Sequence, residues 1–144
     1  IEIGQAEGAT IVVGGAAPDD PALADGAYLM PTVFDNVSND MRIAAEEIFG
    51  PVVSVIPFDT EEEALRLANA TPYGLSGSIW TRDIGKALRS AKALQSGVIS
   101  VISNSSVHTE APFGGYKMSG MGRELGMHAL ELYTEVKNVY VDLT

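Results

Sequence analysis

The stretch Glu46-Glu47-Ile48-Phe49-Gly50-Pro51 leads directly into the apolar run Val52-Val53-Ser54-Val55-Ile56-Pro57-Phe58. This run is rich in β-branched residues and predicts a buried strand. Gly50 and Pro51 mark its start, because Gly relaxes the backbone and Pro cannot continue a helix. The hexapeptide therefore places carboxylates and an aromatic ring on a stiff turn at the edge of a sheet.

Two interpretations of this turn are open. A carboxylate can accept hydrogen bonds from two neighbouring hydroxyls, as on a ribose, and an aromatic ring beside it can pack on a flat heterocycle. Alternatively, the segment is a solvated acidic turn with Phe49 in the hydrophobic core. Local chemistry alone favours this second interpretation. Adjacent side chains on an extended segment point to opposite sides, so Glu46 and Glu47 should not share one role.

Helices and strands alternate downstream of this turn. Asp59 or Thr60 can cap a helix whose acidic first turn, residues 61–63, suits the positive helix N-terminus. The alternation implies an α/β fold in which strands form a parallel sheet joined by right-handed crossovers. The expected elements are a strand over 52–58, a helix over 60–69, a strand over 75–80, a helix over 84–94 closed by Gly97, and a strand over 98–102.

The remaining segments are shorter or less regular. The patterns predict a helix end at 1–7, a strand at 10–13, a loop at 16–26, an extended segment at 28–34, a helical turn at 39–45, a loop at 103–109, a short helix at 123–132 and a strand at 135–143. The alternation of apolar residues in the last segment fits either a strand that pairs with another subunit or an edge strand within this chain.

Composition bounds the function. The 144 residues suffice for one ordinary core, and 46% hydrophobic residues indicate a folded protein. A net charge of −10 disfavours a nucleic-acid or anionic-membrane surface. No apolar run approaches the roughly 18 residues of a membrane span, and no signal peptide is visible. The chain does not begin with Met and starts as if within a helix, so we expect a fragment.

The chain contains no cysteine, so it holds neither a disulfide, nor a thiolate metal site, nor a cysteine nucleophile. His108 and His128 lack companions at metal-ligand spacing, and we expect no metal site.

The glycine-rich stretch over residues 111–126 is a second motif. It does not match the dinucleotide-binding pattern, and Lys117 is followed by Met118, which excludes a P-loop. The glycines predict a tight loop lying close to another part of the chain, with Phe113 at its mouth. Taken alone, the stretch is best explained as a structural loop.

The order of the motifs carries a resemblance. Tyr28-Leu29-Met30-Pro31-Thr32-Val33, the hexapeptide, Asn69-Ala70-Thr71-Pro72-Tyr73-Gly74-Leu75, Pro112-Phe113-Gly114-Gly115-Tyr116-Lys117-Met118-Ser119-Gly120 and Gly122-Arg123-Glu124-Leu125-Gly126 follow one another. This series closely resembles the C-terminal part of the aldehyde dehydrogenase superfamily over essentially the whole chain.

The resemblance implies a three-layer α/β/α fold with a mostly parallel sheet. It implies a partial catalytic domain over 1–134 and an oligomerisation strand over 135–144. The implied enzyme uses NAD or NADP to oxidise an aldehyde to a carboxylic acid through a cysteine thiohemiacetal. The cysteine and general base of that family lie upstream, so we expect the isolated chain to be inactive. We expect a cytoplasmic homo-oligomer. The alternative is a non-catalytic binding or assembly module derived from a truncated aldehyde dehydrogenase.

The resemblance also assigns residues. Glu47 matches the glutamate that binds the nicotinamide ribose hydroxyls, and Phe49 matches the aromatic beside the nicotinamide. Glu124 matches a buried glutamate linked to proton relay, and the alternative for it is a structural carboxylate at a helix N-terminus. Residues implied at the substrate tunnel are Phe113, Val107 and Ser105.

The chain departs from the family pattern at two positions. Ile102 stands where many family members carry Asn, and Val107 stands where a Phe often sits.

Overall fold

The structure is a computed structural model that describes residues 1–105 and 107–144. The chain forms two compact units, Ile1–Thr71 and Pro72–Thr144, and each is described by itself.

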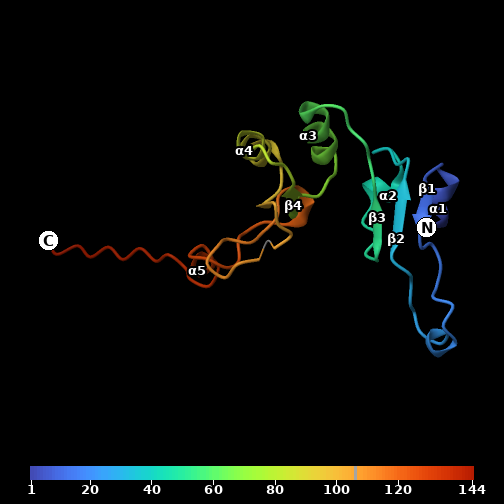
Figure 1. The fold of residues 1–144 in the computed structure, drawn as a ribbon. Helices are drawn as coiled ribbons and strands as arrows, with labels where there is room; N and C mark the ends of the chain where they lie inside the picture. The colour runs from blue at the N-terminus through green and yellow to red at the C-terminus, as the bar shows by residue number, and fades with distance from the viewer. Residues whose placement is uncertain (106) are drawn as a thin grey trace. The chain divides into compact units, whose positions relative to one another are not determined.

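The first unit is built around a three-stranded sheet in the order β1-β2-β3 (Figure 1). β1 pairs with β2 antiparallel, and β2 pairs with β3 parallel. The elements of this unit are α1 (Glu2–Ala6), β1 (Thr10–Val13), η1 (Pro21–Leu23), β2 (Thr32–Asp35), α2 (Arg42–Ala45), β3 (Val52–Ser54) and α3 (Glu61–Asn69).

The core of this unit fixes α2 against α1. Phe34 of β2 is fully buried, and Ile43 of α2 packs in the same cluster. Gly4 permits the approach of the two helices, because a Cβ there would lie 2.8 Å from Ile43 Cδ1. The Glu7 carboxylate accepts a hydrogen bond from the Arg42 backbone N–H at 2.8 Å, which satisfies a free donor at the start of α2. The hexapeptide that follows α2 is therefore anchored at its upstream end.

The prediction of a buried strand over 52–58 is only partly correct. β3 ends at Ser54, although the Val55 amide still donates to the Phe34 carbonyl at 2.8 Å. Pro57 has no N–H to continue the pairing. β3 is the last strand of this sheet in the described chain, and Val53 and Val55 leave one of its faces exposed.

The predicted helix over 60–69 is confirmed as α3. The Thr60 hydroxyl accepts a hydrogen bond from the Glu63 amide at 3.1 Å, and the Glu63 carboxylate accepts one from the Asp59 amide at 3.0 Å. These reciprocal bonds are those of a helix N-cap.

The second unit contains a β-α-β crossover. Its elements are β4 (Ser76–Ile79), α4 (Ile84–Ala93), β5 (Val98–Val101), η2 (Lys117–Ser119) and α5 (Ala129–Leu132). β4 and β5 are parallel and pair in register from Ser76↔Val98 to Ile79↔Val101. Asp83 caps α4 by accepting a hydrogen bond from the Lys86 amide at 3.0 Å.

The α/β class and the predominance of parallel pairing are as predicted, but the sheet is not the expected run of three parallel strands. Among the described residues, β3 pairs with β2, and β4 and β5 form a separate two-stranded sheet. Because β2 supplies the neighbour of β3, the strand that precedes α3 lies in the first unit.

The C-terminal segment differs from the sequence prediction. The expected helix over 123–132 is reduced to α5, because Leu125 (φ 61°) and Gly126 (φ 55°) have left-handed backbones that a right-handed helix excludes. Residues 135–144 run as an extended trace in Figure 1 and belong to neither sheet of the described chain. An edge strand within this chain is therefore wrong, and pairing with a second subunit stays a prediction.

Among the described residues, none of the helices is both long and apolar enough to cross a membrane.

Candidate functional site

The hexapeptide links α2 to β3 through a turn with an unusual backbone. Phe49 has φ 54°, a left-handed conformation that costs a residue with a side chain about 1–2 kcal/mol. The turn is closed downstream by hydrogen bonds from the Val52 amide to the Gly50 carbonyl and from the Thr32 amide to the Pro51 carbonyl, both 2.8 Å. The strained residue is thus held between a helix end and a paired strand.

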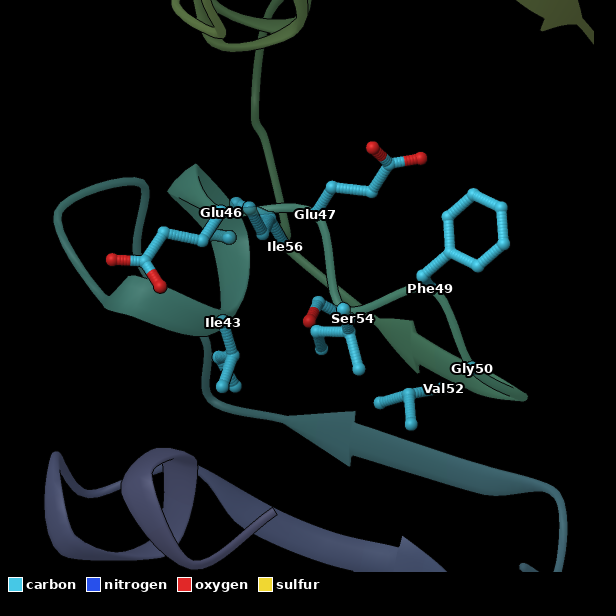
Figure 2. A pocket seen from close by; sticks show the side chains of 10 residues that line it. Ile43, Glu46, Glu47, Phe49, Gly50, Val52, Ser54 and Ile56 are labelled. Carbon is cyan, nitrogen blue, oxygen red and sulfur yellow. The ribbon is translucent and has the colours of Figure 1, made fainter.

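The two carboxylates of the turn have different surroundings (Figure 2). Glu46 forms a bidentate pair with Arg42, at 2.9 Å to Nε and 2.8 Å to Nη2. The hydrogen bonds from Arg42 hold the pKa of the Glu46 carboxyl below its ordinary value. Glu47 points the other way and leaves the turn on the same side as Phe49. As predicted, the side chains of these neighbouring glutamates point to different sides of the turn.

Phe49 is 93% exposed within the described chain, so it lies outside the core of the first unit. An apolar ring that stays in water contributes no hydrophobic stabilisation to folding. The left-handed backbone of Phe49 adds strain. Folding of the described chain alone does not account for a strained, exposed aromatic residue at this position.

Glu47 and Phe49 stand at an open concavity of about 470 Å³ between α2 and β3. Its floor is apolar and comes from Ile43, Val52 and Ile56, with Ser54 beside them (Figure 2). None of its described lining residues is a Lys or Arg, so the concavity suits a neutral group with hydroxyls better than a phosphate. The alternation of Val52, Ser54 and Ile56, in β3 and just beyond its end, is the sequence signal that could have identified this floor.

The glycine-rich stretch of the second unit lies against the segment around Gly74. The Gly74 carbonyl accepts hydrogen bonds from the amides of Gly97, at 3.0 Å, and Tyr116, at 2.8 Å. The Gly74 amide donates to the Ser119 hydroxyl at 2.9 Å. The predicted close approach is therefore present, and it joins the motifs around residues 72 and 116.

Phe113 and Glu124 are tied together through their backbones. The Phe113 amide donates to the Glu124 carbonyl at 2.7 Å, and the reverse bond measures 2.8 Å. Arg123 holds the intervening loop by donating from Nη1 to the carbonyls of Gly115, at 3.0 Å, and Gly122, at 2.6 Å. Its guanidinium also lies 5.5 Å from the Tyr116 ring centroid. The sequence gives no signal for this function of Arg123, because contacts with backbone carbonyls leave no residue pattern.

Among residues 1–105 and 107–144, no group of three or more His, Cys, Asp or Glu side chains is arranged to hold a metal ion.

The sequence profile of the Aldehyde dehydrogenase family matches residues 1–139. The chain belongs to the aldehyde dehydrogenase family. It is 50% identical over 140 residues to betaine aldehyde dehydrogenase of Bacillus subtilis, covering 97% of this chain and 29% of that protein. It is 48% identical over 143 residues to retinaldehyde dehydrogenase 3 of Homo sapiens, covering 99% and 27%.

Solved structures of this family share the fold. A betaine aldehyde dehydrogenase from Staphylococcus aureus in complex with NAD+ has a TM-score of 0.89 at 50% identity, over 92% of this chain and 26% of that one. The indole-3-acetaldehyde dehydrogenase of P. syringae, solved as a mutant with NAD+ and IAA, has a TM-score of 0.91 at 46% identity, over 99% and 28%. The chain thus spans between a quarter and a third of the length of these relatives.

The family residues fall in both units. Glu47 and Phe49 lie in the first unit, and Ser105, Val107, Phe113 and Glu124 lie in the second. Val107 and Ser105 are exposed, and Phe113 is half-buried. Ser106, within the predicted 103–109 loop, lies outside the described residues.

The Glu124 side chain is exposed within the described chain, and α5 begins only at Ala129. The assignment of Glu124 to a buried position behind the active site stays a prediction. The left-handed residues after Glu124 separate it from that helix.

Proposed function

We propose that this chain is the C-terminal part of the catalytic domain of an NAD(P)-dependent aldehyde dehydrogenase that oxidises an aldehyde to a carboxylic acid. The cysteine that forms the thiohemiacetal and the general base belong to the part of the protein upstream of residue 1. Bound NAD(P) supplies the hydride acceptor. The residues of this chain bind the nicotinamide ribose, orient the nicotinamide and line the aldehyde channel.

The observation that carries the proposal is the pair formed by Glu47 and Phe49. Within the described chain, Glu47 has no hydrogen-bond or ion-pair partner, and Phe49 is held strained and exposed beside it. A carboxylate can accept hydrogen bonds from both hydroxyls of the nicotinamide ribose, and the Phe49 ring can pack beside the nicotinamide. The absence of cations in the concavity agrees with a ribose rather than a phosphate.

The other assigned residues have supporting roles in this proposal. Phe113, Val107 and Ser105 line the aldehyde channel, and Glu124 supports proton transfer or the channel wall. Residues 1–134 belong to the catalytic domain, and residues 135–144 form an oligomerisation strand. The exposed apolar side chains of that segment support pairing with a second subunit, since Val136 and Leu143 have no apolar cover in this chain. We place the enzyme in the cytoplasm, with no nucleic-acid or membrane partner.

Aldehyde oxidation by the full-length protein tests the function. Aldehydes mixed with NAD+ or NADP+ should give the absorbance of reduced nicotinamide with the full-length protein and none with residues 1–144 alone. Formation of reduced cofactor by the isolated chain would contradict the proposal that the cysteine and the general base lie upstream of residue 1.

The second candidate, a binding or assembly module, is favoured by the division of these residues into two compact units. Sedimentation separates the candidates. A monomer that binds no apolar dye supports the module, whereas a self-associating chain with exposed apolar surface supports an enzyme part that lacks its neighbour.

A further inference from the structure

The chain reverses direction at the end of β5. The Ile102 amide donates to the Ile79 carbonyl at 2.8 Å, which extends the β4–β5 pairing by one residue. Ile102 then adopts φ 54°, a left-handed conformation that takes the chain out of the sheet. Residues 103–105 follow directly after this turn.

Two serines of the sheet meet these residues. Ser78 of β4 and Ser100 of β5 are register partners, so their side chains leave the same face of the sheet. The Ser78 hydroxyl donates to the Ser103 carbonyl at 2.9 Å, and the buried Ser100 hydroxyl donates to the Ser105 carbonyl at 3.0 Å. One cross-strand pair thus holds two carbonyls of one loop.

The loop is also closed on itself. The Ser105 amide donates to the Ser103 hydroxyl at 3.0 Å. Residues 103–105 are therefore fixed by three hydroxyl bonds, two of them to the sheet. A short polar loop without such bonds would sample many conformations, because each released backbone residue regains conformational entropy.

We propose that Ser78 and Ser100 are positioning residues for the aldehyde channel. They do not touch the aldehyde. They hold the backbone of Ser103 and Ser105, and so set the position of the Ser105 side chain. This inference rests on the proposed function, in which Ser105 lines the channel.

The test uses the full-length enzyme with Ser78→Ala, Ser100→Ala and the double variant. Each removes one hydroxyl and adds no volume, so folding should persist. Loss of one hydrogen bond predicts a roughly 3- to 10-fold rise in KM for the aldehyde, with kcat within about twofold of wild type. Hydrogen exchange of peptides covering 102–105 should accelerate by a similar factor.

Two matched variants control the result. Ser78→Thr keeps the hydroxyl on an exposed strand residue and should restore the wild-type KM. Ser76→Ala removes an exposed serine from the same strand face, where it pairs with Val98 and not with the loop, and should change neither KM nor exchange.

Unchanged exchange in the double variant would overturn the proposal. Faster exchange with an unchanged aldehyde KM would overturn it as well, because the loop would then not shape the channel. A full-length wild-type protein that oxidises no aldehyde contradicts the proposed function instead. In that case the role of Ser78 and Ser100 in aldehyde binding is contradicted too. Faster hydrogen exchange in their variants would still show that they attach the loop to the sheet.

Discussion

Gly97 and Gly114 pass so close that a Cβ added to Gly97 would lie 1.7 Å from the Gly114 carbonyl oxygen. Gly97 precedes β5, and Gly114 belongs to the glycine-rich stretch. Both neighbourhoods converge on Gly74, whose carbonyl accepts bonds from the Gly97 and Tyr116 amides. The glycines of separate motifs are therefore required by one close backbone approach.

Gly97→Ala should destabilise the protein strongly. The added methyl meets backbone, which cannot rotate away, so we expect a loss of about 3 kcal/mol or more in the free energy of unfolding. The midpoint of thermal unfolding measures this loss. Gly50→Ala is the control, because its Cβ would meet nothing nearer than 3.8 Å, and it should change the midpoint little. Equal midpoints for the two variants would contradict the close approach.

Local sequence signals predicted α3 and α4 well, but they predicted the pairing of the strands poorly. Thr60 caps α3 as expected, and Asp83 caps α4 in the same way, because a cap depends only on residues within one turn. The partner of β3 could not be predicted, since a strand's apolar pattern fits several neighbours. The failure of the 123–132 helix followed from the left-handed backbone at Leu125, which a leucine does not signal.

Ile102→Asn should stabilise the protein. A β-branched residue is poorly tolerated at φ 54°, whereas Asn accepts this conformation, so we expect a gain of about 1 kcal/mol. Val53 is the matched control, because both side chains are 59% exposed and β-branched. Val53→Asn places Asn in β3, where it is disfavoured, and should lower the unfolding midpoint. Thermal unfolding in which both variants lose stability would contradict the strain at Ile102.

Arg123→Met should lower stability by about 1–3 kcal/mol, because it removes two hydrogen bonds to carbonyls and the contact with the Tyr116 ring. Arg66→Met is the control. Arg66 pairs with Glu63 at 3.5 Å on the surface, and its loss should change stability by less than about 0.5 kcal/mol. Denaturant unfolding of both variants tests the difference, and a larger effect at Arg66 would count against the anchoring of the glycine-rich loop.

The Arg42–Glu46 pair should give a small acid-dependent stability term. Hydrogen bonding from Arg42 lowers the pKa of Glu46 from its ordinary value of 4.5 in the folded state. Its contribution is therefore fully present above pH 4.5 and is lost as the pH falls through the lowered pKa. Wild type and Glu46→Gln should differ in unfolding midpoint at neutral pH and converge at low pH. High salt should reduce the difference, and a gap that widens in acid would contradict this sign.

The candidate site was predictable in part. The hexapeptide pointed to a carboxylate beside an aromatic ring, and the alternating directions of Glu46 and Glu47 followed from extended backbone. The exposure of Phe49 could not be derived, since an aromatic residue before an apolar strand is more often buried. The attachment of the 103–105 loop by Ser78 and Ser100 could not be predicted either, because the sequence of one strand does not determine its register with another.

The binding of NAD+ to full-length Glu47→Gln and Glu46→Gln tests the central claim most directly. Glu47→Gln removes the charged carboxylate that would accept hydrogen bonds from the ribose hydroxyls. The dissociation constant of this variant for NAD+ should therefore rise roughly 10-fold or more. Glu46→Gln alters only the pair with Arg42 and should stay within about twofold of wild type. Equal dissociation constants for the two variants, or a higher one for Glu46→Gln than for Glu47→Gln, would contradict the assignment of Glu47 to the nicotinamide ribose.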